Sequence, residues 1–112
     1  MLRTDSLKRN GDFRALYARG KSFAGVYLAI YTRQNRVKRT RLGLTVSTKL
    51  GNAVTRNRIR RRLREAYRLN EAFFRPGADI VIVARSRALT ADFKDLQAEL
   101  LSLGARLGVL QR

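Results

Sequence analysis

Residues 49–68, KLGNAVTRNRIRRRLREAYR, concentrate the side chains that could do chemistry in this sequence of 112 residues. The segment contains one lysine, Lys49, seven arginines and a single acid, Glu65. A guanidinium group is planar and permanently charged, donates two parallel hydrogen bonds to a phosphate and stacks on bases. This composition indicates binding of a polyanion. The seven arginines are Arg56, Arg58, Arg60, Arg61, Arg62, Arg64 and Arg68.

The basic segment contains regularly spaced apolar residues, which a disordered basic tail would lack. These residues predict an amphipathic helix. At about 100° per residue, Ile59, Leu63, Ala66 and Tyr67 fall in one arc. The opposite arc holds most of the arginines together with Asn57, whose amide lies between two guanidinium groups in the sequence. We therefore expect a packed helix over about 53–70 that turns a dense guanidinium face outward.

A solvated charged face is the simpler interpretation of such a helix, but the charges do not balance. The segment has too few carboxylates at i,i+4 to neutralise its arginines, and like charges at that spacing destabilise a helix. Lys49 and Asn52, a candidate cap, precede the first helical turn, whose backbone N–H groups attract phosphate. We therefore expect an anion-binding face, and RNA is the polyanion that we expect it to bind.

Three aromatic residues form a second candidate site. Phe13 and Tyr17 are four residues apart on a short helix expected at 11–19, and Tyr31 lies in a strand expected at 26–32. On periodicity alone, the aromatics of the helix cover the sheet. The functional alternative is a stacking surface for unpaired bases, because aromatic faces accept any base. The sequence leaves both interpretations open.

Other polar residues offer less. The turn at 33–41 is either a solubilising loop or a further RNA contact, and the sequence does not separate the two. The eight acids are scattered, and Asp79, Asp92 and Asp95 are interpreted as structural. With no cysteine and no histidine, we expect no catalytic residue and no metal site of the usual kinds. The basic residues of the turn are Arg33, Arg36, Lys38, Arg39 and Arg41.

Composition places the chain among small globular proteins. It carries a formal charge of +17, from 25 basic and 8 acidic residues, and 45% of its residues are hydrophobic. A bound polyanion would relieve the self-repulsion of this charge. The arginine bias is also consistent with a GC-rich genome, which would carry no mechanism. Residues 1–112 are expected to form one domain of a cytoplasmic protein, with no membrane-spanning segment.

The elements that must position these residues follow from periodicity and turn signals. After the helix at 11–19 come strands at 26–32 and 42–47, and a further short strand before residue 26 is an option. The arginine helix follows, then a buried strand at 79–84 and a last helix that Thr90 could cap. We expect an α+β two-layer sandwich, a small mixed sheet with helices, in the order α-β-β-(β)-α-β-α. The helix between two parallel strands would generically make a right-handed crossover.

The segment GNAVTRNRIRRRLRE resembles the arginine-rich signature of the bacterial ribonuclease P protein component. LKRNGDFRALYARGKS is similar to the family's N-terminal helix, and LGLTVSTKLGNAV to the strand that leads into the signature. The resemblance covers nearly the whole chain. It implies a left-handed crossover in place of the generic right-handed one. Lysine is frequent in the family where this chain has Arg60, and phenylalanine where it has Tyr17; both changes keep the charge or the stacking.

The resemblance also implies a function. Proteins of this family assist a catalytic RNA, which holds Mg²⁺ and cleaves the 5′ leader from precursor tRNA. By position, Phe13, Tyr17 and Tyr31 match the aromatic wall that contacts the leader. We take the catalytic RNA and precursor tRNA as partners, with neither DNA nor membrane, and no cofactor on the protein itself. The RNA-binding residues expected are Lys49, Asn52, Arg56, Asn57, Arg58, Arg60, Arg61, Arg62, Arg64 and Arg68.

Three other functions were considered. A ribosomal-protein-like structural RNA binder would use the same basic helix without a cleft for a single strand. An autonomous ribonuclease would need histidines or paired carboxylates, which the sequence does not offer. A membrane-active basic peptide would have no use for the core-forming strands.

Overall fold

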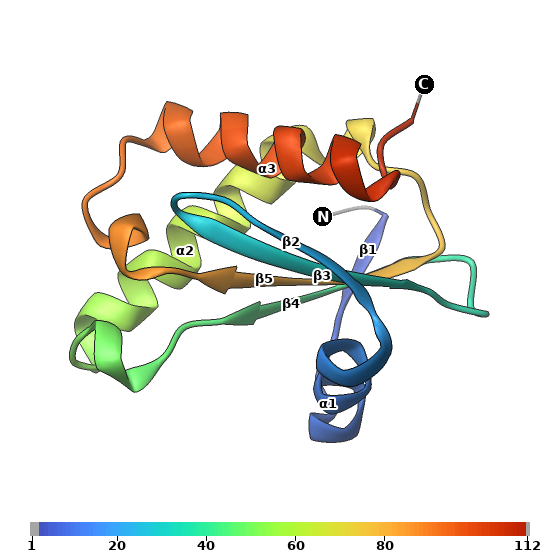
Figure 1. The fold of residues 1–112 in the computed structure, drawn as a ribbon, viewed down its shortest axis with the longest axis horizontal. Helices are drawn as coiled ribbons and strands as arrows, with labels where there is room; N and C mark the ends of the chain where they lie inside the picture. Colours follow the sequence, from blue (N-terminus) through green and yellow to red (C-terminus); the bar gives the residue numbers. More distant parts are fainter. Residues whose placement is uncertain (1–2, 112) are drawn as a thin grey trace.

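The computed structural model describes residues 3–111 and has the α+β architecture expected (Figure 1). Short 3₁₀ turns at Thr48–Leu50, Glu71–Phe73 and Ser86–Leu89 connect the main elements. Within residues 3–111, no helix combines the length and the apolar character that a membrane crossing requires. The main elements are β1 (Thr4–Ser6), α1 (Asn10–Arg19), β2 (Lys21–Ala24), β3 (Leu28–Gln34), β4 (Thr40–Thr45), α2 (Ala53–Asn70), β5 (Ala78–Ala84) and α3 (Phe93–Leu107).

The five strands form one mixed sheet in the order β1-β4-β5-β3-β2. β4 is parallel to β1 and to β5, whereas β3 is antiparallel to β5 and to β2. β5 lies in the centre, and Ile80, Val81 and Ile82 are almost completely buried, as expected for a strand covered on both faces. β4 and β5 are parallel neighbours joined through α2, the crossover for which the resemblance implies a left hand.

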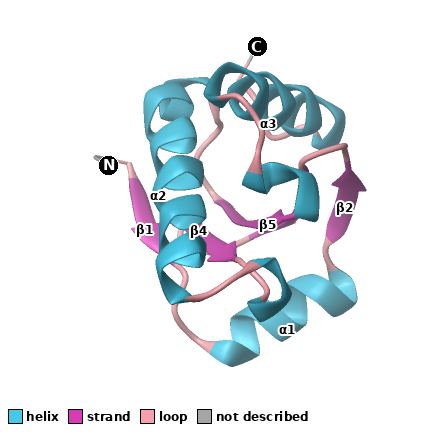
Figure 2. Ribbon diagram, turned by 90° about the vertical axis from the view of Figure 1, so that its left-hand side faces the viewer, coloured by secondary structure: helices cyan, strands magenta, loops and turns pink. Residues whose placement is uncertain are grey.

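Helices cover the two faces of the sheet unequally. α2 and α3 pack on one face, where Ile30, Ile80 and Ile82 share a core with Leu63 and Leu100. Figure 1 shows α3 above the sheet and α1 below it, and Figure 2 shows α2 beside β4, near the β1 edge. Within residues 3–111, α1 is thus the only helix on the second face, and part of that face has no helix packed on it.

Strand β2 confirms the short strand that was an option before residue 26, whereas β1 is an additional strand that the sequence did not predict. Two caps differ from expectation. Asp12 does not cap α1, because that helix begins earlier, at Asn10, with Arg9 at the cap position. Thr90 does not cap α3, because Ser86–Leu89 forms a 3₁₀ turn and Asp92 takes the cap position, without a side-chain hydrogen bond.

Asp79 has the structural role expected of it. Its buried carboxylate accepts hydrogen bonds from Arg41 at 2.6 and 2.7 Å and from the Asn35 amide at 2.9 Å. The pairing raises the pKa of Arg41 above its usual value. Arg39 pairs in the same way with Asp5, at 3.0 Å. Two cations of the 33–41 segment are thus already engaged inside the protein, and they tie β4 to its neighbours.

Candidate nucleic-acid interface

The rotation of α2 about its axis is fixed by its cap and by its buried residues. The Oδ1 of Asn52 accepts a hydrogen bond from the backbone N–H of Thr55 at 2.9 Å, which confirms Asn52 as the cap. Ile59, Leu63 and Tyr67 are at most 3% exposed and anchor the opposite side of the helix in the core. This anchoring turns most of the arginines of α2 toward solvent, as the periodicity predicted.

Four of the predicted RNA-binding residues line one hollow on the outer side of α2. The hollow has a volume of about 530 Å³, and Arg60, whose guanidinium donates to the Oδ1 of Asn57 at 2.9 Å, shapes one wall. Val54, which is 77% exposed, supplies an apolar patch. No carboxylate lines this space. We call it the arginine hollow, and its other lining residues are Arg61 and Arg64.

Two further arginines of α2 point to the other flank of the helix. Arg58 and Arg62 line a separate hollow of about 330 Å³, between α2 and the 3₁₀ turn before α3. The guanidinium of Arg62 donates to the carbonyl of Ala91 at 2.5 Å, so this side chain also holds the turn against α2. Leu89 adds an apolar wall. The structure therefore divides the predicted arginine face between two surfaces.

The remaining predicted residues differ in how they are engaged. Arg68, near the end of α2, pairs through two nitrogens with Glu65, and this holds the pKa of the Glu65 carboxyl below its usual value. Lys49 lies in the 3₁₀ turn before the helix and is exposed. The Nε of Arg56 is buried and has no hydrogen-bond partner in residues 3–111. A buried donor without an acceptor costs free energy.

The three aromatic residues lie together on the second face of the sheet. The rings of Tyr17 and Tyr31 pack edge to face, with centroids 4.9 Å apart. The hydroxyl of Tyr17, a residue that is 39% exposed, shares a hydrogen bond of 2.7 Å with the hydroxyl of Thr45. Phe13 belongs to the same cluster and lies over Gly43. We call Phe13, Tyr17, Tyr31 and Thr45 the aromatic surface.

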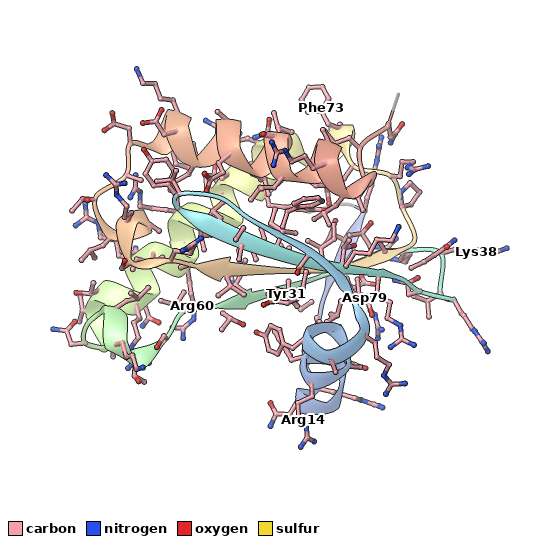
Figure 3. All side chains as sticks on the ribbon, in the orientation of Figure 1. Arg14, Tyr31, Lys38, Arg60, Phe73 and Asp79 are labelled. Atoms are coloured by element: carbon pink, nitrogen blue, oxygen red, sulfur yellow. The ribbon has the colours of Figure 1, made fainter. Side chains whose placement is uncertain are left out.

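The aromatic surface adjoins a part of the sheet that no helix covers. Ala29, Val83 and Thr45 are paired in register on β3, β5 and β4, and all three are half-buried. Figure 3 shows Tyr31 below the sheet, on the α1 side, with Arg60 near the beginning of α2. In Figure 1, α1 and the first turns of α2 flank this open part of the sheet. A basic wall and an aromatic wall thus border one apolar floor.

Phe13 fits the covering interpretation better than the two tyrosines do. A Cβ added at Gly43 would lie 2.6 Å from two ring atoms of Phe13, so the ring lies directly on the strand. The ring is half-buried and is therefore part of the wall and part of the core. Sequence reasoning missed Gly43 and Thr45; the signal for Gly43 was a glycine inside a strand, which often marks a close approach.

This packing gives a first testable prediction. Replacing Gly43 by alanine should displace the Phe13 ring, with a cost in unfolding free energy of about 1–2 kcal/mol as for other overpacked sites. Gly11→Ala is a matched control, because a Cβ there meets nothing within 4 Å and the residue is helical. Urea unfolding of both variants measures the difference. Equal stability of the two variants would show that the ring does not rest on Gly43.

A guanidinium-lined hollow beside an aromatic-walled sheet surface defines a small α+β protein of the nucleic-acid-binding class. The family model described as Ribonuclease P matches residues 1–108. The chain is 46% identical, over 108 residues, to the ribonuclease P protein component of Clostridioides difficile strain 630. The alignment covers 96% of this chain and 95% of that protein. The chain belongs to the ribonuclease P protein family, whose members are protein components of a ribonucleoprotein endoribonuclease.

Solved structures of the family have the same fold. The RNase P protein of Staphylococcus aureus superimposes with a TM-score of 0.84 at 34% identity, covering 95% of this chain and 97% of that one. The RNase P protein of Thermotoga maritima superimposes with a TM-score of 0.80 at 31% identity, covering 88% of this chain and 93% of that one. The α+β assignment and the family resemblance are therefore both confirmed.

Proposed function

We propose that this chain acts in ribonuclease P by binding the catalytic RNA through α2 and the 5′ leader of precursor tRNA on the aromatic surface. The observation that carries the proposal is the arginine hollow, which has guanidinium and amide groups but no carboxylate. A folded helix with so many uncompensated cations is stabilised by a polyanionic partner. Family membership makes the RNA of ribonuclease P the partner of choice.

The arginine hollow supplies the contacts to the catalytic RNA. Arg60, Arg61 and Arg64 converge on one space, where their guanidinium groups can donate hydrogen bonds to phosphate oxygens. Asn57 adds an amide that donates and accepts hydrogen bonds. Contacts of this kind bind RNA without reading its sequence, and their strength falls as salt rises.

The leader lies on the aromatic surface. Unpaired bases stack on tyrosine faces, and stacking tolerates any base. The floor formed by Ala29 and Val83 is apolar and half-buried, so bases placed there exclude water from it. Because the first turns of α2 flank the same open sheet surface, a strand on the tyrosines continues toward the RNA bound at α2.

Chemistry is assigned to the RNA in this proposal. Mg²⁺ bound by the catalytic RNA supplies the Lewis acid and activates the attacking water for phosphodiester hydrolysis. The protein neutralises phosphate charge beside that site and holds the leader in place. Both effects raise the affinity of the ribonucleoprotein for its substrate and for the metal ions. The ribonucleoprotein acts on precursor tRNA in the cytoplasm.

A reconstitution separates this proposal from its alternatives. Precursor tRNA is incubated at low magnesium with the protein, with a ribonuclease P RNA, and with both. We expect cleavage at the mature 5′ end only in the combined reaction. Cleavage by the protein alone would make it an autonomous nuclease. RNA binding without stimulation of cleavage would favour a structural RNA-binding protein of the ribosomal type.

A further inference from the structure

A second basic hollow lies at the opposite end of the sheet from the arginine hollow. Its volume is about 430 Å³, and it opens between the C-terminal end of α3, the segment that leads into β5, and the beginning of β2. Figure 1 shows these segments at the end of the sheet away from the first turns of α2. Of the residues that the sequence analysis considered for RNA contact, only Arg33 of the 33–41 turn lines this space. We call it the Lys21 hollow.

The Lys21 hollow is surrounded by cations. Arg19, Lys21, Arg33 and Arg75 line it, with the amide of Gln34, and all five side chains are exposed. No carboxylate lines the hollow, and none of its cations takes part in the four ion pairs found within residues 3–111. Four like charges around one space repel each other, and an anion placed between them relieves that cost.

The backbone holds these cations in place. Gly20, between Arg19 and Lys21, is packed so closely that an added Cβ would lie 2.6 Å from the carbonyl oxygen of Leu16 and 2.9 Å from that of Thr32. Only glycine therefore fits at the junction of α1 and β2, and this close packing fixes where the two flanking side chains begin. Across the hollow, the guanidinium of Arg75 donates to the Gly108 carbonyl at the end of α3.

The Lys21 hollow lies beside the aromatic surface, at the end of β3. Arg33, which lines the hollow, follows Tyr31 by two residues on β3 and so lies on the same face of the sheet, whereas Lys21, paired with Thr32, lies on the opposite face. β2 is an edge strand whose four residues are all exposed. A polynucleotide that crosses the sheet over Tyr31 and follows β3 therefore reaches Arg33 at the mouth of the hollow. Its negatively charged backbone then meets the cations of the hollow.

We propose that the Lys21 hollow binds the phosphate backbone of RNA, as a second basic contact separate from the arginine hollow. The inference rests on the proposed function, because it requires an RNA partner. The phosphodiester chemistry is the same whether the strand is the upstream part of a long leader or a segment of the catalytic RNA. The path from Tyr31 to Arg33 along β3 places the binding at the end of the sheet where a strand leaves the aromatic surface.

The test uses a double variant, Arg19→Gln with Lys21→Gln, in the reconstituted holoenzyme. Arg33 and Arg75 are left unchanged, since Arg33 is the register partner of Asp79 and Arg75 holds the end of α3. The matched control is Arg87→Gln with Lys94→Gln, which removes the same charge from exposed positions outside both hollows. A second double variant, Arg19→Lys with Lys21→Arg, keeps the charge at the site.

Two affinities are measured against KCl concentration. The first is that of the protein for the catalytic RNA, and the second is that of the reconstituted holoenzyme for precursor tRNA with a short or a long leader. Losing two phosphate contacts should lower the salt slope by about 1.4–1.8, since each contributes about 0.7–0.9. The charge-keeping variant should retain the slope. A fall with the long leader alone assigns the hollow to the leader, and a fall with the catalytic RNA assigns it to that RNA.

Two results would overturn the inference. If the Arg19/Lys21 variant and the control lower the slope equally for every RNA, the hollow is not a phosphate site, although the proposed function stands. If the unmodified protein binds none of the three RNAs, the proposed function fails and this inference fails with it. Thermal unfolding of each variant checks that the protein still folds. If the glutamine variant is destabilised, its salt slope is compared with that of the charge-keeping variant.

Discussion

Replacing Arg60, Arg61 and Arg64 together by glutamine is expected to weaken binding of the catalytic RNA about 50- to 200-fold near 0.15 M salt. Each phosphate contact contributes about 0.7–0.9 to the salt slope, which amounts to about four- to sixfold in affinity at that concentration. The three side chains line one hollow without a carboxylate, so they are expected to act on the same RNA segment. Filter binding over a salt series measures both the affinity and the slope.

The same substitution should leave the fold intact or stabilise it. The three arginines point into solvent or a surface hollow, and like charges three or four residues apart on a helix repel each other. Removing them relieves that repulsion, so the melting temperature should stay level or rise while RNA affinity falls. Substitution of the same three residues by lysine is the matched control, since it should keep most of the slope. A fall in both stability and affinity would assign these arginines to the fold.

The sequence predicted α2 well because one physical rule decides it. Ile59, Leu63 and Tyr67 recur at the helical period, and burying them leaves only one rotation of the helix. The division of the arginines between two surfaces was not predictable in the same way. Arg62 donates to the carbonyl of Ala91, 29 residues further along, and no local pattern reveals such a contact.

Pairings across the sheet were also invisible in the sequence. Arg41 and Asp79 meet because β4 and β5 are parallel neighbours in one register, which the separate strand patterns do not specify. β1 spans only three residues and has too little pattern to be recognised. The same limit applies to the Lys21 hollow, whose four cations come from α1, β2, β3 and the segment before β5.

The aromatic residues show how the structure narrows an open choice. Periodicity alone could not separate sheet cover from a stacking surface. Leu16 is the buried residue of α1 and packs with Val81 of the sheet, so α1 covers the sheet there without the tyrosines. Tyr17 remains 39% exposed beside an uncovered apolar floor. This exposure favours stacking for the tyrosines, whereas Phe13 is committed in part to the core.

Replacing Tyr17 and Tyr31 together by leucine is therefore expected to weaken binding of precursor tRNA by the holoenzyme about 30-fold or more, since each ring stacked on a base contributes about 1–3 kcal/mol. Leucine keeps apolar cover over the sheet, so the stability cost should be limited to the lost edge-to-face pair and the lost Tyr17–Thr45 hydrogen bond, about 0.5–1.5 kcal/mol each. Mature tRNA, which has no leader, should bind as before. Equilibrium binding of both RNAs, with thermal unfolding of the variant, measures the three quantities.

Phe23→Leu is the matched control for this double variant. Phe23 is 42% exposed on β2, but its register partner Ile30 lies in the core under α2 and α3, so its ring is on the other face of the sheet. Its loss should not distinguish precursor from mature tRNA, because no leader reaches it in the proposed arrangement. If the double variant weakens both RNAs equally, the tyrosines only shape the protein. A loss confined to the precursor requires bases on the α1 side of the sheet, since only there do Tyr17 and Tyr31 present their rings.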